Sequence, residues 1–255
     1  DLPIPRPTNI LLGGDFTRKG IPVETGTPAA LPPLEKQGAS ANRLDLARWL
    51  VDPRHPLTAR VAVNRMWQQY FGRGIVETED DFGIRGAAPT HPELLDWLAS
   101  EFVANGWSQK KMHRLIVTSA TNRQSSRARK DLEKTDPDNR LLARQTRMRL
   151  EAEIVRDVAL TASGLLEGTV GGPSVFPPQP NLASLRADSG PWIADSGANR
   201  YRRGMYTSIR RGAPHIVLQL FDAPDPTQSC TRRNRSNTPL QALALLNDEA
   251  FHEFA

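Results

Sequence analysis

Arginine side chains are concentrated in two short segments of the C-terminal half, and these residues have the most to offer a ligand. A guanidinium forms paired hydrogen bonds with carboxylate, sulfate or phosphate groups. Asn237 precedes an expected helix, whose first backbone N–H groups favour an anion. We therefore predict a ligand-binding site for an anion that comprises Arg202, Arg203, Arg210, Arg232, Arg235 and Asn237. The alternative is that these arginines neutralise nearby acids, namely Asp188, Asp195, Asp222 and Asp225.

Aromatic residues lie close to these arginines in the sequence. Trp192 and Tyr201 are expected to form a stacking surface of the site, because flat rings beside guanidinium groups suit a sugar or a base. Phe176 and Tyr206 belong to the same region. The same rings would also serve to pack an irregular segment onto the body of the protein, and that alternative stays open.

Three residues are candidates for catalysis. His113 stands beside Arg114 in a helical pattern that buries Met112, which leaves the imidazole near the rim. Asp81 and Asp222 fall in loop-like segments, where two carboxyl groups could converge as a glycosidase pair about 5–9.5 Å apart. An ordinary hydrogen-bonded histidine and turn-forming aspartates explain the same residues, so the sequence identifies no catalytic group.

The histidine and cysteine pattern predicts no metal site. Five histidines are present, and no two of them have the close spacing of a metal-binding pair. The single cysteine, Cys230, excludes a disulfide within the chain and lies in no CxxCH motif, so we expect no haem and no other cofactor in this chain. We expect Cys230 to be a small buried residue.

Size and composition are those of a globular protein. The chain has 255 residues, 38% hydrophobic and 24% charged, with a formal net charge of +5. It contains no apolar run that could cross a membrane and no visible signal peptide, and it begins as though it were cut from a longer protein. The basic residues are interspersed with acids and no nucleic-acid-binding module is present, so we expect no nucleic-acid partner.

The elements that must position these residues are mainly helices. We expect a mainly α fold with an extended N-terminal arm (1–41), a helical core (42–166), a Pro/Gly-rich excursion with a short strand (167–214) and a C-terminal helical segment (215–255), all in one domain. Apolar spacing predicts helices from Asn42, from Thr58 to Phe71, from a Thr90–Glu93 capping box, and from Ser108. It also predicts a long helix over 139–166, a strand over 205–209, a helix over 216–221 and a last helix from Thr238.

Three longer motifs indicate a family. NRLDLARWL and LTARVAVNRMWQQYFGRGIV occupy 42–50 and 57–76, and RSNTPLQALALLND occupies 235–248. With THPELLDWLA, YRRGMYT and FDAPDP in order between them, the chain resembles the planctomycete-type (PSD-type) domain of unknown function that lies C-terminal to cytochrome c domains in large exported bacterial proteins. The resemblance covers nearly the whole chain. It implies an exported, periplasmic or cell-surface location, with c-type haem only in upstream domains of the parent protein.

We expect such a domain to bind or process an extracellular polymer, and the arginines and aromatic rings favour an anionic polysaccharide. If it is an enzyme, it would be a polysaccharide hydrolase or the substrate domain of an oxidative system. The alternative is a structural domain that docks the haem-bearing and companion domains of its own polypeptide and carries no ligand chemistry. An exposed apolar patch would favour that alternative.

Overall fold

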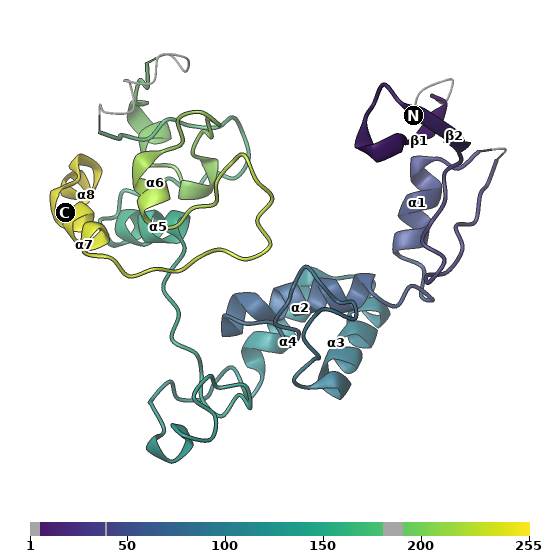
Figure 1. Cartoon of the computed structure of the whole chain (residues 1–255). Coiled ribbons are helices and arrows are strands. Elements are labelled where there is room, and N and C mark those ends of the chain that lie inside the picture. Colours follow the sequence, from purple (N-terminus) through teal and green to yellow (C-terminus); the bar gives the residue numbers. More distant parts are fainter. Residues whose placement is uncertain (1–5, 39, 181–190) are drawn as a thin grey trace. The chain divides into compact units, whose positions relative to one another are not determined.

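The computed structural model describes residues 6–38, 40–180 and 191–255, and the described chain is mainly helical (Figure 1). It forms two compact units, residues 1–146 (unit 1) and 147–255 (unit 2). The expected division into an arm, a core, an excursion and a C-terminal segment stays a prediction. No helix in the described ranges combines the length and the apolar character needed to cross a membrane.

Unit 1 begins with a small antiparallel hairpin. Strand β1 (Thr8–Leu11) pairs with β2 (Lys19–Val23), and a short 3-10 turn over Leu12–Gly14 joins them. Helix α1 (Arg43–Leu50) begins at Asn42, whose side chain accepts from the backbone N–H groups of Leu44 and Asp45. The start predicted at Asn42 is therefore confirmed. The spacing of Leu44, Leu46 and Leu50 suggested a buried face, but all three side chains are exposed.

The core of unit 1 is an apolar cluster between α2 (Thr58–Phe71), α3 (Pro92–Ala104) and α4 (Gln109–Thr118). Its buried members include Val63, Trp67, Phe71, Leu95, Leu98, Phe102, Met112 and Ile116. Asn64 is fully buried among them, and its amide bonds both the N–H and the carbonyl of Val76. A buried amide is tolerated here because its hydrogen-bonding groups are used. Trp97 lies in the helical pattern of α3, which favours a place in the core, but its side chain is 49% exposed.

Helix boundaries in unit 1 follow the sequence with two exceptions. Helix α2 ends at Gly72, which adopts a left-handed conformation with a φ of 77°, and Ser108 caps α4. The capping box predicted at Thr90 is wrong: His91 precedes α3 without a side-chain cap, and Thr90 instead donates to the carbonyl of Ile75. Thr58 is likewise the first residue of α2 and does not cap it.

The long helix predicted over 139–166 is much shorter. Only α5 (Ala152–Ala162) is helical in that stretch. Asn139 and Leu142 both have positive φ angles, 54° and 55°, which an α-helix does not accommodate. The carboxylate of Asp136 accepts from the backbone N–H groups of Arg140 and Leu141, and these local bonds replace helical ones.

Unit 2 packs α5 with α6 (Ile216–Leu220), α7 (Pro239–Asn247) and α8 (Glu249–Phe254). Helices were predicted at the positions of α6 and α7, and Thr238 caps α7 in a box with Gln241. The strand predicted over 205–209 is absent: a 3-10 turn over Gly204–Tyr206 leads into an isolated parallel bridge between Thr207 and Val175.

The apolar core of unit 2 is small. Its buried members are Leu160, Ala250 and Phe254, with Tyr201 and Phe251 packed against them. Cys230, expected to be buried, is exposed, and its thiol donates to the carbonyl of Arg232. Polar and charged side chains must therefore supply much of what holds unit 2 together.

Candidate functional site

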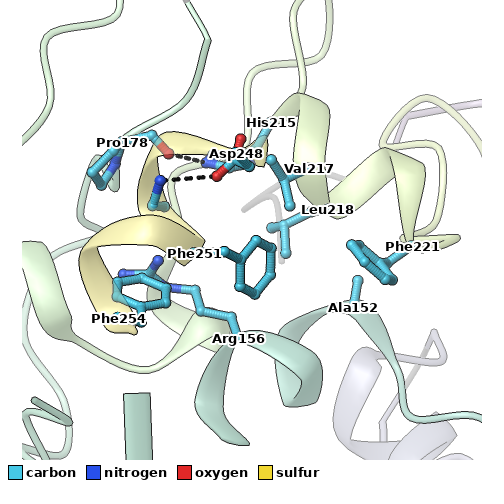
Figure 2. A pocket seen from close by; sticks show the side chains of 11 residues that line it. Ala152, Arg156, Pro178, His215, Val217, Leu218, Phe221, Asp248, Phe251 and Phe254 are labelled. Carbon is cyan, nitrogen blue, oxygen red and sulfur yellow. Dashed lines mark hydrogen bonds between the residues drawn. The ribbon is translucent and has the colours of Figure 1, made fainter. Parts of the chain in front are cut away.

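Unit 2 contains a pocket bounded by α5, α6 and α8, with Pro178 closing one side (Figure 2). It measures about 330 Å³ with its open mouth, and the space in which the centre of a water molecule can lie is about 20 Å³. Most of the 330 Å³ is open mouth, and the enclosed part has room for about one water molecule. The lining residues are Ala152, Arg156, Pro178, His215, Val217, Leu218, Phe221, Asp248, Ala250, Phe251 and Phe254.

Three phenylalanine rings form most of the apolar wall. Phe251 makes edge-to-face contacts with Phe221 and Phe254, at centroid distances of 6.3 and 5.9 Å. The spacing of three residues between Phe251 and Phe254 places both rings on one side of α8. On α5, Ala152 and Arg156 share a face because they are four residues apart. A ligand in this pocket would therefore meet flat apolar surfaces with a few polar groups between them.

Arg156 places a buried guanidinium in the wall. Its side chain donates from Nη2 to the carbonyl of Arg200 at 2.7 Å and lies over the ring of Phe254, with Cζ 5.3 Å from the centroid. Its Nε has no hydrogen-bond partner and Arg156 has no ion pair within the described parts of the chain. Burial lowers the pKa of Arg156 to about 10, and the carboxylates of Asp157 and Glu253 oppose that shift. The guanidinium is thus charged at neutral pH.

Each acid near Arg156 is already committed to another group. Asp157 accepts from Nε of Arg203 at 2.9 Å and from the backbone N–H of Gly204 at 2.6 Å. Glu253 accepts from both Arg200 and Tyr201. Asp248 caps α8 by accepting from the N–H of Ala250, and burial raises the pKa of its carboxyl group. Arg156 is therefore left without a carboxylate of its own, which is unusual for a buried charge.

His215 is the second buried polar group of the pocket. Its Nε2 lies 3.1 Å from the carbonyl of Pro178, and its Nδ1 has no partner among the described residues. Trp192 packs against the imidazole edge to face, with centroids 5.5 Å apart. Burial lowers the pKa of His215 to about 4, so the ring is neutral at physiological pH.

The predicted arginine site does not come together as one open surface. Arg202 is buried, donates to the carbonyls of Thr169, Gly171 and Pro173, and lies 3.8 Å over the ring of Tyr206. These contacts make it a tether for the glycine-rich stretch that begins at 168. These carbonyls use both Nη atoms, and Nε of Arg202 is buried without a partner among the described residues.

Three further members of the predicted site have partners within unit 2. Arg203 pairs with Asp157, and Arg235 lies 3.5 Å from Glu151. Asn237 accepts a hydrogen bond from Arg149, and the Thr238–Gln241 box already satisfies the first N–H groups of α7. Arg203 and Arg235 do pair with acids, as the alternative proposed, but the acids are Asp157 and Glu151. Of the acids proposed for that role, Asp188 lies outside the described residues.

Arg210, Arg232 and the two aromatic residues occupy separate positions. Arg210 lies beside the rings of Phe176 and Trp192, with Cζ 5.4 and 5.3 Å from their centroids, whereas Arg232 is exposed. Trp192 donates from its indole N–H to the carbonyl of Pro177 at 2.7 Å. The hydroxyl of Tyr201 donates to Glu253. Ligand binding by these residues stays a prediction.

None of the three candidates for catalysis is among the residues that line the pocket. In unit 1, His113 shares a hydrogen bond of 2.9 Å with the hydroxyl of Tyr70, and Asp81 accepts from the N–H of Gly83 in a turn. In unit 2, Asp222 accepts from the N–H and the hydroxyl of Ser236, which ties the end of α6 to the chain before α7. Each side chain thus has a local structural use.

The three polar residues of the pocket, Arg156, His215 and Asp248, are not in the site predicted from the sequence. Arg156 belongs to a run in which arginine and glutamate alternate, a pattern that suggests i,i+4 ion pairs along a helix. The signal that could have found it is its spacing of four residues from both Ala152 and Leu160, which puts it on the buried side of α5. No comparable signal marks His215 or Asp248, because their partners are distant in sequence.

In the described part of the chain, no three histidine, cysteine or acidic side chains are grouped as a metal site. A haem of the c type would require a CxxCH motif, which the sequence lacks. Searches of curated proteins and of solved structures each found no match to this chain. Residues 42–255, which include nearly all of α1 to α8 and the whole pocket, match one family over their full length. The chain belongs to the PSD1 family of proteins of unknown function (DUF1553).

Proposed function

We propose that this domain binds an acidic ligand with an apolar face in the pocket of unit 2. In the longer parent protein, the ligand would be the end group of an extracellular anionic polysaccharide. The domain would act as the recognition module of an exported protein whose c-type haem lies in upstream domains. That context rests on the resemblance of the sequence motifs.

The observation that carries the proposal is the buried guanidinium of Arg156, which has no ion pair among the described residues. Removing a charge from water costs several kcal/mol unless a partner compensates it. A carboxylate or sulfate on the ligand would be that partner, and the rings of Phe251 and Phe254 would cover its apolar face. This combination of apolar walls and a few polar groups is typical of small-molecule sites.

The size of the pocket favours an end group over an internal stretch of polymer. The 330 Å³ includes the open mouth and the enclosed part is much smaller, so only the acidic group of the ligand and the atoms next to it would enter, while the rest of the ring would lie in the mouth. The lining contains one carboxyl group, that of Asp248, and this group caps α8. Glycoside hydrolysis ordinarily uses two carboxyl groups, so the pocket supports binding better than hydrolysis.

The proposal is tested by titrating the whole chain with glucuronate, galacturonate and glucose in isothermal calorimetry. We expect both uronates to bind and glucose to bind at least tenfold more weakly. Replacing Arg156→Met keeps an apolar stem of similar length and should abolish uronate binding. The matched control is Arg211→Met, at an exposed arginine of unit 2 outside both the pocket and the predicted arginine site, which should leave the affinity unchanged. Uronate binding that survives Arg156→Met would overturn the site.

One observation favours the docking alternative. Helix α7 exposes Leu240, Leu243, Leu245 and Leu246, while its buried residue is Gln241. A row of exposed leucines marks a surface that a protein partner could cover. The haem-bearing and companion domains of the same polypeptide are the partners that this second proposal names. If no acid bound to the unsubstituted chain, the docking function would be preferred.

A further inference from the structure

The pocket contains two unpaired nitrogens of opposite hydrogen-bonding character. Nε of Arg156 and Nδ1 of His215 are both buried and both without a partner among the described residues. Arg156 Nε can only donate, because a guanidinium has no lone pair to offer. Whether Nδ1 of His215 donates or accepts depends on the hydrogen bond that the other ring nitrogen, Nε2, makes.

Pro178 determines which nitrogen of His215 carries the proton. A carbonyl oxygen can only accept, so the 3.1 Å contact to Nε2 requires that Nε2 carries the hydrogen. The ring is neutral, because burial lowers its pKa to about 4, and Nδ1 therefore presents a lone pair. The pocket thus offers one obligate donor and one obligate acceptor between apolar walls.

We infer that the ligand is a hydroxycarboxylate, whose carboxylate pairs with Arg156 and whose adjacent hydroxyl donates to Nδ1 of His215. This inference rests on the proposed function and narrows its ligand class. A uronic acid satisfies both requirements, since its ring carries hydroxyl groups beside the carboxylate. A plain carboxylic acid leaves the histidine lone pair unsatisfied, and a buried unsatisfied group costs affinity. A fully ionised sulfate offers no hydrogen to donate.

The other titratable groups of the pocket do not supply the missing donor. Asp248 is committed to the N–H of Ala250 at the start of α8. Asp157 and Glu253, which act on the charge of Arg156, are paired with Arg203 and with Arg200 and Tyr201. No residue that lines the pocket donates to Nδ1, and we assign that donor to the ligand.

Three probes that differ at one position test the inference on the whole chain: mandelate, phenylacetate and O-methylmandelate. Mandelate has the hydroxyl, phenylacetate lacks it, and the methyl ether keeps the oxygen but has no hydrogen to donate. We expect mandelate to bind about tenfold more tightly than either of the others, as one hydrogen bond to a buried acceptor would give. The ¹⁵N signal of His215 Nδ1 should shift with mandelate and stay in place with phenylacetate.

Two variants complete the test. His215→Phe removes the acceptor while keeping a ring against Trp192. In this variant we expect mandelate and phenylacetate to bind with about equal affinity. His252→Phe, at an exposed histidine of α8, is the matched control and should keep the tenfold preference. Equal binding of mandelate and phenylacetate that still depends on Arg156 would overturn the hydroxyl inference and leave the proposed function standing. If none of the acids bound, the proposed function itself would fail. The comparison of probes on the unsubstituted chain decides the matter even if His215→Phe does not fold.

Discussion

The two units are stabilised by different kinds of contact. Unit 1 has a cluster of eleven buried apolar residues, and its buried Asn64 is fully bonded. The corresponding cluster in unit 2 has three members, and the charged side chains of Arg156, Asp157, Arg202 and Asp248 are buried around it. Unit 1 also buries the acidic residues Asp45, Glu79 and Asp136, but among the described residues the buried guanidinium groups, those of Arg156 and Arg202, belong to unit 2. A buried cation is a group that an acidic ligand can compensate.

The largest expected effect is in unit 1. Trp67→Ala would empty a site at 5% exposure against Phe71, whose ring stacks 4.2 Å from that of Trp67. We expect the free energy of unfolding to fall by about 3–5 kcal/mol in urea denaturation. Trp97→Ala, at the exposed tryptophan of α3, should change it by less than about 1 kcal/mol. Similar losses at both positions would break the distinction between core and surface.

In unit 2 we expect a smaller loss of unfolding free energy, which appears as the pH falls. The pKa of His215 is about 4 in the folded chain and about 6.5 when unfolded. Between these values the unfolded chain binds a proton that the folded chain does not. The stability that His215 contributes is therefore complete above pH 6.5 and is lost as the pH falls toward 4, by up to about 3 kcal/mol.

The difference in unfolding free energy between the original chain and His215→Phe, measured from pH 7 to pH 4, isolates this contribution. Hydrogen exchange read by mass spectrometry would assign it to unit 2. A difference that does not change with pH would show that His215 is not buried as a neutral ring.

The smallest of the three effects concerns the carboxylate of Asp157. Asp157→Asn keeps the shape but removes the charge that holds Arg203, so we expect a loss of about 2 kcal/mol. Protection of Gly204 and its neighbours in hydrogen exchange should fall with it. Asp225→Asn, in an exposed turn, is the control and should cost less than about 0.5 kcal/mol. An unchanged stability in Asp157→Asn would mean that the ion pair contributes nothing to unit 2.

The helices of unit 1 could be predicted because their signals are local. The apolar spacing in α3 and α4 and the glycine after α2 lie within a few residues of the boundaries that they set. The helix expected over 139–166 failed because Asp136 redirects two N–H groups and because Leu142 adopts a positive φ. Neither effect appears in the apolar pattern.

The site was harder to predict because ion pairing is a long-range property. The sequence shows where the arginines are, but Arg233 pairs with Glu153, which is 80 residues away along the chain. Arg202 also lies among several charged residues in the sequence, yet both of its Nη atoms donate to backbone carbonyls of residues 169–173. Arg156 is buried because α8 packs beside it. The spacing of residues within α5 shows which face is buried but does not show what covers that face.

The exposure of Cys230 has a practical consequence. It is the single thiol of the chain and it is accessible, so a maleimide dye or a nitroxide will attach at one position of the unmodified sequence. The nearby Arg233 anchors that loop to the first turn of α5 through Glu153, in the same unit as the pocket. A label at Cys230 is therefore attached to the unit that holds the pocket, and its fluorescence or paramagnetic signal offers a direct optical or magnetic readout of ligand titrations without any engineered residue.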